Sequence, residues 1–138
     1  MRPMETTTFT VRTGGEDRVA DITRQCAEFA RGRGAGLLHV FVPHATAGVA
    51  LLELGSGSDA DLLAVLRDLL PADDRWGHAH GSRGHGRSHV LPAFVPPYAT
   101  VPVGPDGRLT LGTWQSIALV DVNVDNAERT VRLDFLAG

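Results

Sequence analysis

Histidine is the residue type best suited to chemistry in this chain, and its six copies are unevenly placed. Four fall in the glycine-rich segment 77–89, while His39 lies inside an expected strand and His44 directly after it. Neutral imidazole is the commonest metal ligand, and three histidines with a water molecule form a known open zinc site. The spacing matches no zinc-finger pattern, and a single cysteine makes a closed structural zinc site a poor explanation.

The residues alone leave the role of each histidine open. Metal binding and a solvated loop explain His78 and His89 equally well, whereas His39 is better explained as a partly buried strand residue. We interpret His80 and His85, which small residues flank, as loop residues. Long polar loops of this kind are usually functional or disordered.

Other chemistry is limited by what the chain lacks. All 13 basic residues are arginine, so neither a lysine Schiff base nor a Walker-type phosphate loop is available. No Gly-x-Ser-x-Gly nucleophile elbow occurs. Trp114 and Gln115 offer a stacking surface and an amide, although a core tryptophan at a β-bend explains Trp114 about as well.

The elements that position these residues follow from hydrophobic periodicity and turn residues. One helix is expected from the face Val19, Ile22, Cys26 and Phe29, and a second from the cap Ser58 to a stop at Pro71. Strands are expected at 6–12, 37–42, 49–54, 98–103, 108–111, 116–124 and 130–136, with hairpins in the C-terminal third. This mixture predicts an α+β fold with a largely antiparallel β-sheet core and two main helices.

Composition narrows the class of protein. The chain has 138 residues, a mass of 14.7 kDa and a net charge of −3, which fits a single domain over residues 1–138 and argues against nucleic-acid binding. We expect no membrane association, because no apolar run is long enough and the first residues are not a signal peptide. Cys26 is interpreted as a core residue, and its being the only cysteine favours a reducing, cytoplasmic location.

Several motifs resemble the YjbQ family, also called UPF0047, of small bacterial and archaeal proteins. The most specific is 109–117, Leu-Thr-Leu-Gly-Thr-Trp-Gln-Ser-Ile, which contains the Gly-Thr-Trp-Gln signature. Shorter matches follow in chain order: His44-Ala45-Thr46-Ala47, Asp59-Ala60-Asp61, Trp76-Gly77-His78, Ser88-His89 and Val101-Pro102-Val103. Some members of this family carry the label secondary thiamine-phosphate synthase.

The resemblance implies a YjbQ-like domain that assembles as a homotrimer. It also implies a site where His44, His78 and His89 converge on a divalent metal such as zinc. We expect Thr46, Trp114, Gln115 and Arg87 to contact a small-molecule substrate, with phosphorylated compounds among the candidates. No catalytic residue is assigned.

The departures from the family pattern affect the expected activity. Gly55-Ser56-Gly57 stands where the family carries Asn-Glu-Asn, so a carboxylate that could manage protons is missing. The resemblance therefore implies a metal-binding protein whose thiamine-phosphate synthase-like transferase activity is weak or absent. The alternatives are a zinc-dependent hydrolase and a non-catalytic module that binds a metal or a small molecule.

Overall fold

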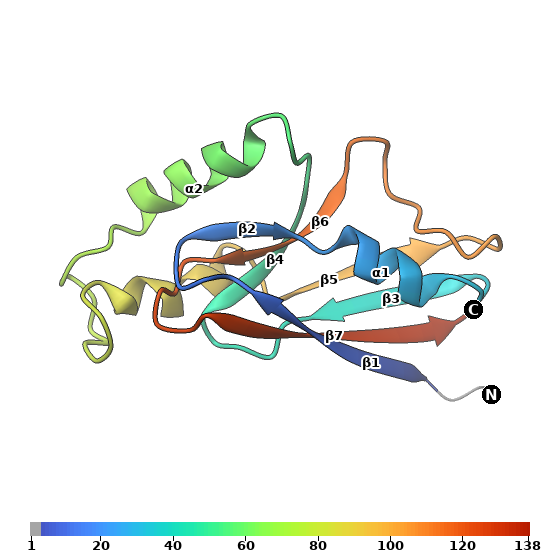
Figure 1. The fold of residues 1–138 in the computed structure, drawn as a ribbon, viewed down its shortest axis with the longest axis horizontal. Helices are drawn as coiled ribbons and strands as arrows, with labels where there is room; N and C mark the ends of the chain where they lie inside the picture. Colours follow the sequence, from blue (N-terminus) through green and yellow to red (C-terminus); the bar gives the residue numbers. More distant parts are fainter. Residues whose placement is uncertain (1–3) are drawn as a thin grey trace.

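Two antiparallel sheets form the body of the protein in the computed structural model, which describes residues 4–138 (Figure 1). The larger sheet has the strand order β1-β7-β3-β5 and the smaller one β2-β6-β4. The strands are β1 (Glu5–Arg12), β2 (Arg18–Asp21), β3 (Gly36–Phe41), β4 (Ala47–Leu52), β5 (Tyr98–Val103), β6 (Ser116–Asp121) and β7 (Glu128–Ala137). The helices are α1 (Thr23–Ala30), α2 (Ser58–Leu69) and two short 3-10 helices, η1 (His85–His89) and η2 (Leu91–Ala93). The predicted α+β fold with a largely antiparallel core and two main helices is confirmed.

The main core lies between the two sheets. Strand alternation turns Leu38 and Val40 of β3 and Leu133 of β7 inward, where they meet Ile117 and Leu119 of β6. The buried face of α1 joins this core through Ile22 just before it and through Cys26 and Ala30 within it. Cys26 is fully buried, as expected of a core residue.

A second, smaller core lies on the other face of the three-stranded sheet. Here α2 contributes Leu66, with Leu70 just after it, and η2 begins with Leu91. These side chains pack against Val120 and Val122, at the end of β6 and just beyond it. The second core therefore fixes the polar loop that joins α2 to η1 on the body of the protein.

Several local predictions are wrong. The segment around Val19 forms β2 rather than the first turn of α1, because Val19 pairs with Val120 of β6. Ser58 is the first residue of α2 rather than its cap, since Gly57 occupies the cap position with φ of 105°. The expected strand at 108–111 is reduced to a single bridge between Val103 and Leu109. The predicted turn at 104–107 does form a short hairpin, in which Gly104 N–H donates to the Arg108 carbonyl and Thr110 N–H to the Pro102 carbonyl. The predicted hairpin between 116–124 and 130–136 does not form, because β6 and β7 lie in different sheets.

No helix or strand within residues 4–138 covers the outer face of the larger sheet. Leu37, Tyr98 and Leu136 point away from the core and are 43%, 53% and 55% exposed. Their three strands lie side by side, so the exposed apolar side chains share one face. No helix within residues 4–138 has the length and apolar character needed to cross a bilayer.

Candidate functional site

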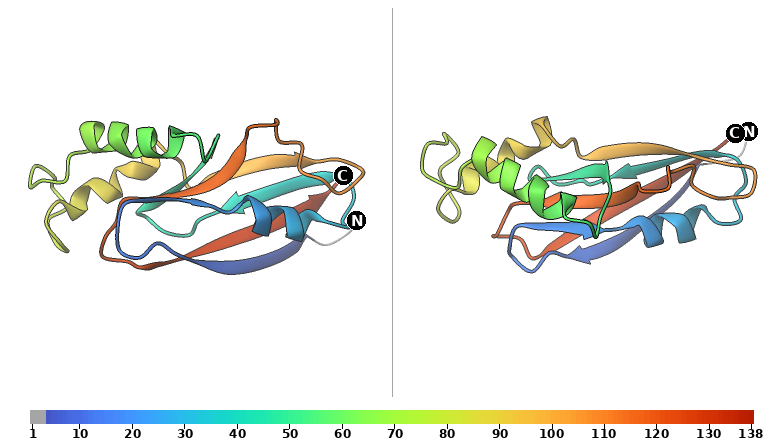
Figure 2. Two further views of the ribbon diagram at one scale, coloured as in Figure 1. Left: turned by 45° about the horizontal axis from the view of Figure 1, so that its top comes forward. Right: turned by 90° about the horizontal axis from the view of Figure 1, so that it is seen from above.

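The loop after α2 carries four of the six histidines and folds back on itself (Figure 2). The indole Nε1 of Trp76 donates a hydrogen bond to the carbonyl oxygen of Pro71 at 2.8 Å. A Cβ atom on Gly86 would lie only 2.4 Å from the Trp76 Cβ, so this close contact needs glycine. Because Trp76 lies against η1, His78 comes to lie beside His85 and His89.

Three of these histidines form a compact group. One ring nitrogen from each of His78, His85 and His89 lies within 4.8 Å of the other two. The Nε2 atoms of His85 and His89 are 3.1 Å apart, and the rings of His78 and His89 stack with centroids 3.7 Å apart. A tetrahedral zinc ion with nitrogen ligands at about 2.0–2.1 Å places neighbouring nitrogens about 3.3 Å apart. The group therefore has the ligand type and the approximate spacing of a zinc site.

One member of the group, His89, has an environment that favours its neutral form. The Nδ1 atoms of His78 and His85 are buried and have no aligned hydrogen-bond partner. Burial lowers the pKa of His89, and the neighbouring His78, His85 and His80 lower it further. Neutral imidazole is the form that binds metal ions.

His44 lies outside this group. Its Nε2 accepts a hydrogen bond from the backbone N–H of Thr130 at 2.9 Å, and that bond occupies the lone pair a metal would need. Burial lowers the pKa of His44, and the nearby Arg129 contributes to the shift. A single chain thus brings together His78 and His89 but not His44, whose predicted share in the metal site stays a prediction.

Thr46 and Arg87 are engaged in buried contacts. The Thr46 hydroxyl accepts hydrogen bonds from Arg129 Nη2 at 2.9 Å and from Asn123 Nδ2 at 3.0 Å. The Arg87 guanidinium contacts both carboxylate oxygens of Asp17 at 2.8 Å, and its side chain is 6% exposed. Both residues are buried, so neither side chain is openly presented to a substrate.

Trp114 and Gln115 lie far from the histidine group of the same chain. They precede β6, whereas Asp125, which contacts His85, follows it. A six-residue strand spans roughly 20 Å at about 3.4 Å per residue. Trp114 is 72% exposed and is not a core residue, while Gln115 Oε1 accepts a hydrogen bond from the backbone N–H of Gly112.

The segment 55–57 lies at the same end of the molecule as Trp114. It follows β4, whose last residue, Leu52, pairs with Ser116 at the start of β6. The histidine loop instead follows the C-terminal end of α2, a twelve-residue helix that is about 18 Å long at about 1.5 Å per residue. Within one folded chain, the residues that match the family motifs therefore lie at two opposite ends of the molecule.

His85 is the member of the group that the sequence reasoning missed. Its four-residue spacing from His89 was a usable signal, because side chains three or four residues apart meet on one side of a helical turn. His80 lies close by, with its ring centroid 4.1 Å from that of His78, but it is not part of the three-histidine group.

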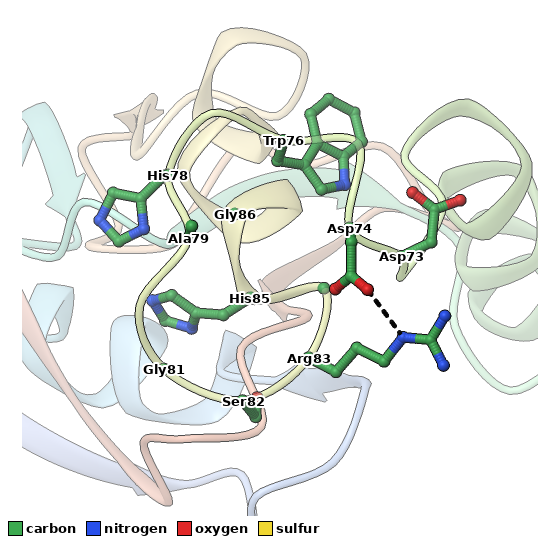
Figure 3. A pocket seen from close by; sticks show the side chains of 11 residues that line it. Asp73, Asp74, Trp76, His78, Ala79, Gly81, Ser82, Arg83, His85 and Gly86 are labelled. Atoms are coloured by element: carbon green, nitrogen blue, oxygen red, sulfur yellow. Dashed lines mark ion pairs between the residues drawn. The ribbon is translucent and has the colours of Figure 1, made fainter.

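A polar cavity of about 360 Å³ opens beside the group (Figure 3). Figure 3 shows His78 and His85 on one side of the loop and the ion pair of Asp74 with Arg83 on the other. Hydrogen bonding from Ser82 holds the pKa of the Asp125 carboxyl, just beyond this cavity, below its usual value. The cavity gives a small polar ligand access to two of the three histidines.

Comparisons with known proteins agree with this fold. The family model described as UPF0047 protein YjbQ-like matches residues 7–138. A UPF0047 protein of Mycobacterium tuberculosis is 58% identical over 121 residues, which cover 88% of this chain and 90% of that protein. A crystal structure of a hypothetical protein from Aeropyrum pernix has a TM-score of 0.88 and 34% identity, covering 97% and 99% of the two chains. A YbjQ-like protein of unknown function from Sulfolobus solfataricus has a TM-score of 0.90 and 25% identity, and the match covers 99% of each chain. With a family model spanning nearly its whole length and close relatives that carry the same name, the chain belongs to the UPF0047, or YjbQ-like, family.

Proposed function

We propose that this protein binds a divalent metal ion, with zinc as the best candidate, through His78, His85 and His89. The supporting observation is that three ring nitrogens lie within 4.8 Å of one another, while the buried Nδ1 of His78 has no hydrogen-bond partner within residues 4–138. Three imidazoles leave a fourth zinc position open. A zinc ion held in this way would supply a Lewis acid and a bound water molecule of lowered pKa.

Zinc content and affinity test the metal site. We expect the reconstituted protein to hold one zinc ion per chain after dialysis, as measured by mass spectrometry of the metal. His85→Ala and His89→Ala should weaken zinc binding strongly, whereas His39→Ala, on the open sheet face, should not. His44→Ala separates the two ligand sets: retained affinity supports the set with His85, and a loss as large as that of His85→Ala supports the set with His44. A parent protein that retains no zinc would overturn the proposal.

Metal and small-molecule binding with little turnover is the function that this group favours. The carboxylates in or beside the cavity are all paired, Asp73 with Arg75, Asp74 with Arg83, and Asp125 with His85 and Ser82. Each of these three has a hydrogen-bonding or charged partner, which makes it a weaker general base than an unpaired carboxylate. We therefore expect weak or absent thiamine-phosphate synthase-like activity.

An assay with the pyrimidine diphosphate and the thiazole phosphate tests this expectation. Product formation should be negligible in the parent and should stay so in a variant with Gly55→Asn, Ser56→Glu and Gly57→Asn, because segment 55–57 lies a helix length from the histidines of its own chain and reaches a histidine group only if a neighbouring chain supplies it. Robust turnover by the parent would contradict the proposal. Turnover gained by the variant would show that segment 55–57 does reach the reacting groups.

We also propose a homotrimer as the assembled form. If Trp114 and Gln115 serve the same ligand as the histidines, they must reach it from another chain, because β6 separates them in their own. The uncovered face of the larger sheet supports association between copies.

A further inference from the structure

A carboxylate outside the three-histidine group contacts it directly. Asp125 lies in the turn between β6 and β7, and its Oδ2 is 2.9 Å from His85 Nδ1. The opposite ring nitrogen of His85, Nε2, is 3.1 Å from His89 Nε2. His85 therefore lies between a carboxylate on one side and the candidate ligand group on the other.

This placement of a carboxylate behind a candidate ligand is similar to the one found at metal-binding histidines. Such a histidine gives one nitrogen to the metal and donates the other N–H to a carboxylate or a carbonyl, which fixes the tautomer and the ring orientation. The carboxylate at His85 meets the distance of an ion pair, but it lies off the direction of a linear N–H bond.

The Asp125 carboxylate is itself held in place by the fold. Its Oδ2 accepts a hydrogen bond from the backbone N–H of Ser82 at 3.0 Å, and the Asp125 N–H donates to Asn123 Oδ1 at 2.9 Å. A Cβ on Gly81 would lie 2.8 Å from both the Asp125 carboxylate and the His85 ring, so the loop closes over this pair only with glycine there. Because Asn123 is buried and bonded to Thr46, the carboxylate is tied to the core.

We propose that Asp125 is a positioning residue that holds the proton of His85 on Nδ1 and so presents Nε2 to the metal shared with His78 and His89. The inference rests on the proposed metal site. It goes beyond that site by assigning a role to a residue of the β6–β7 turn, which no family motif quoted above includes. Removing such a carboxylate typically lowers metal affinity about 10- to 100-fold.

The test compares Asp125→Asn with Asp74→Asn. The asparagine keeps an oxygen that can accept the Ser82 N–H but removes the charge beside His85. Asp74 is a matched control, since it lines the same cavity and pairs with Arg83 rather than with a histidine. Zinc affinity is measured by competition with a chromophoric chelator, and the ligand geometry by the visible absorption spectrum of the Co²⁺-loaded protein.

We expect Asp125→Asn to weaken zinc binding by about 10- to 100-fold and to change the Co²⁺ spectrum. Asp74→Asn should match the parent in both measurements. Asp125→Glu retains the charge and should bind zinc more tightly than Asp125→Asn. Circular dichroism of the metal-free variants shows whether each one folds.

The outcomes separate this inference from the proposed function. A parent that binds neither Zn²⁺ nor Co²⁺ rejects the metal site itself. A parent that binds both ions, beside an Asp125→Asn variant with unchanged affinity and spectrum, rejects only the role of Asp125. A double-mutant cycle decides how the residue acts: Asp125→Asn should have no further effect in a His85→Ala background, and a full additional loss there would reject action through His85. If Asp125→Asn fails to fold, Asp125→Glu decides between the two results.

Discussion

Arg129 and Asp121 form a fully buried ion pair below the His44 loop. Arg129 Nε lies 2.7 Å from Asp121 Oδ2, and the two side chains are 2% and 0% exposed. The guanidinium also donates to the Thr46 hydroxyl, so it joins β7, β6 and the segment that carries His44. Such a pair adds little net stability compared with apolar residues, but losing one partner leaves a buried charge alone.

We therefore expect Arg129→Met to lower the free energy of unfolding by about 3–5 kcal/mol, measured by urea denaturation. Arg12→Met is the matched control, because Arg12 pairs with Glu128 on the surface, where the side chains are 83% and 55% exposed. The control should change stability little, since exposed ion pairs contribute little. If the two variants are equally mild, Asp121 has found other partners and our account of the pair is wrong.

The reactivity of the Cys26 thiol is also determined by its environment. Burial in the core raises the pKa of Cys26 to about 12, and the charge of Asp21 adds to the shift. The thiolate is the reactive form, so the folded protein should react with Ellman's reagent only as fast as it unfolds. The denatured protein should react at once, and Cys26→Ala should not react at all. Fast labelling under native conditions would show that α1 opens readily from the core.

At the scale of elements, close approach between segments depends on particular glycines. A Cβ on Gly48, in β4, would lie 2.1 Å from the carbonyl oxygen of Val95, which follows η2. Gly48→Ala should therefore force β4 away from the segment after η2 and destabilise the fold by about 1–3 kcal/mol. Gly77→Ala is the control, because a Cβ there meets no atom within 4 Å. Thermal unfolding of both variants measures the difference, and equal midpoints would contradict the packing described here.

Local sequence patterns predict individual helices and strands of this protein but not how the strands pair. The apolar stripe of α2 and the alternation in β3 and β5 are local properties, and this helix and these two strands are present as predicted. Strand pairing is not local. Strands β6 and β7 follow one another after a short turn and lie in different sheets, because β7 is paired on both sides by β1 and β3. Turn residues such as Asp125 and Asn126 predict a change of direction but not which strand is the partner.

The membership of the histidine group could also be predicted only in part from the sequence. His78 and His89 came from matched motifs, while His85 joins them because Trp76 packs on Gly86 and folds the loop back. That contact depends on a glycine whose importance the sequence does not reveal. His44 was expected in the same set, but a backbone N–H of β7 occupies its Nε2.

At the scale of the whole molecule, no helix or strand within residues 4–138 covers the outer face of the larger sheet. Strands β1 and β5 are the edges of the larger sheet, and the face between them exposes Leu37, Tyr98 and Leu136. Open edges and apolar faces are normally covered or paired. Within residues 4–138 the helices α1 and α2 pack against the two cores, so neither covers this face. A second copy of the chain is the occupant that we expect there.

We expect the protein to be a homotrimer in solution, with three times the 14.7 kDa mass of one chain in light scattering. The open face predicts association, and the number three is what the family resemblance implies. Leu136→Arg should place a charge in the apolar face and shift the mass toward one chain. Val65→Arg is the control, because Val65 is 59% exposed on α2, away from this face, and its change should leave the mass as in the parent. A parent that scatters as a monomer at micromolar concentration would reject the trimer. It would also show that Trp114 and the histidines do not serve one ligand, because β6 holds them apart within each chain.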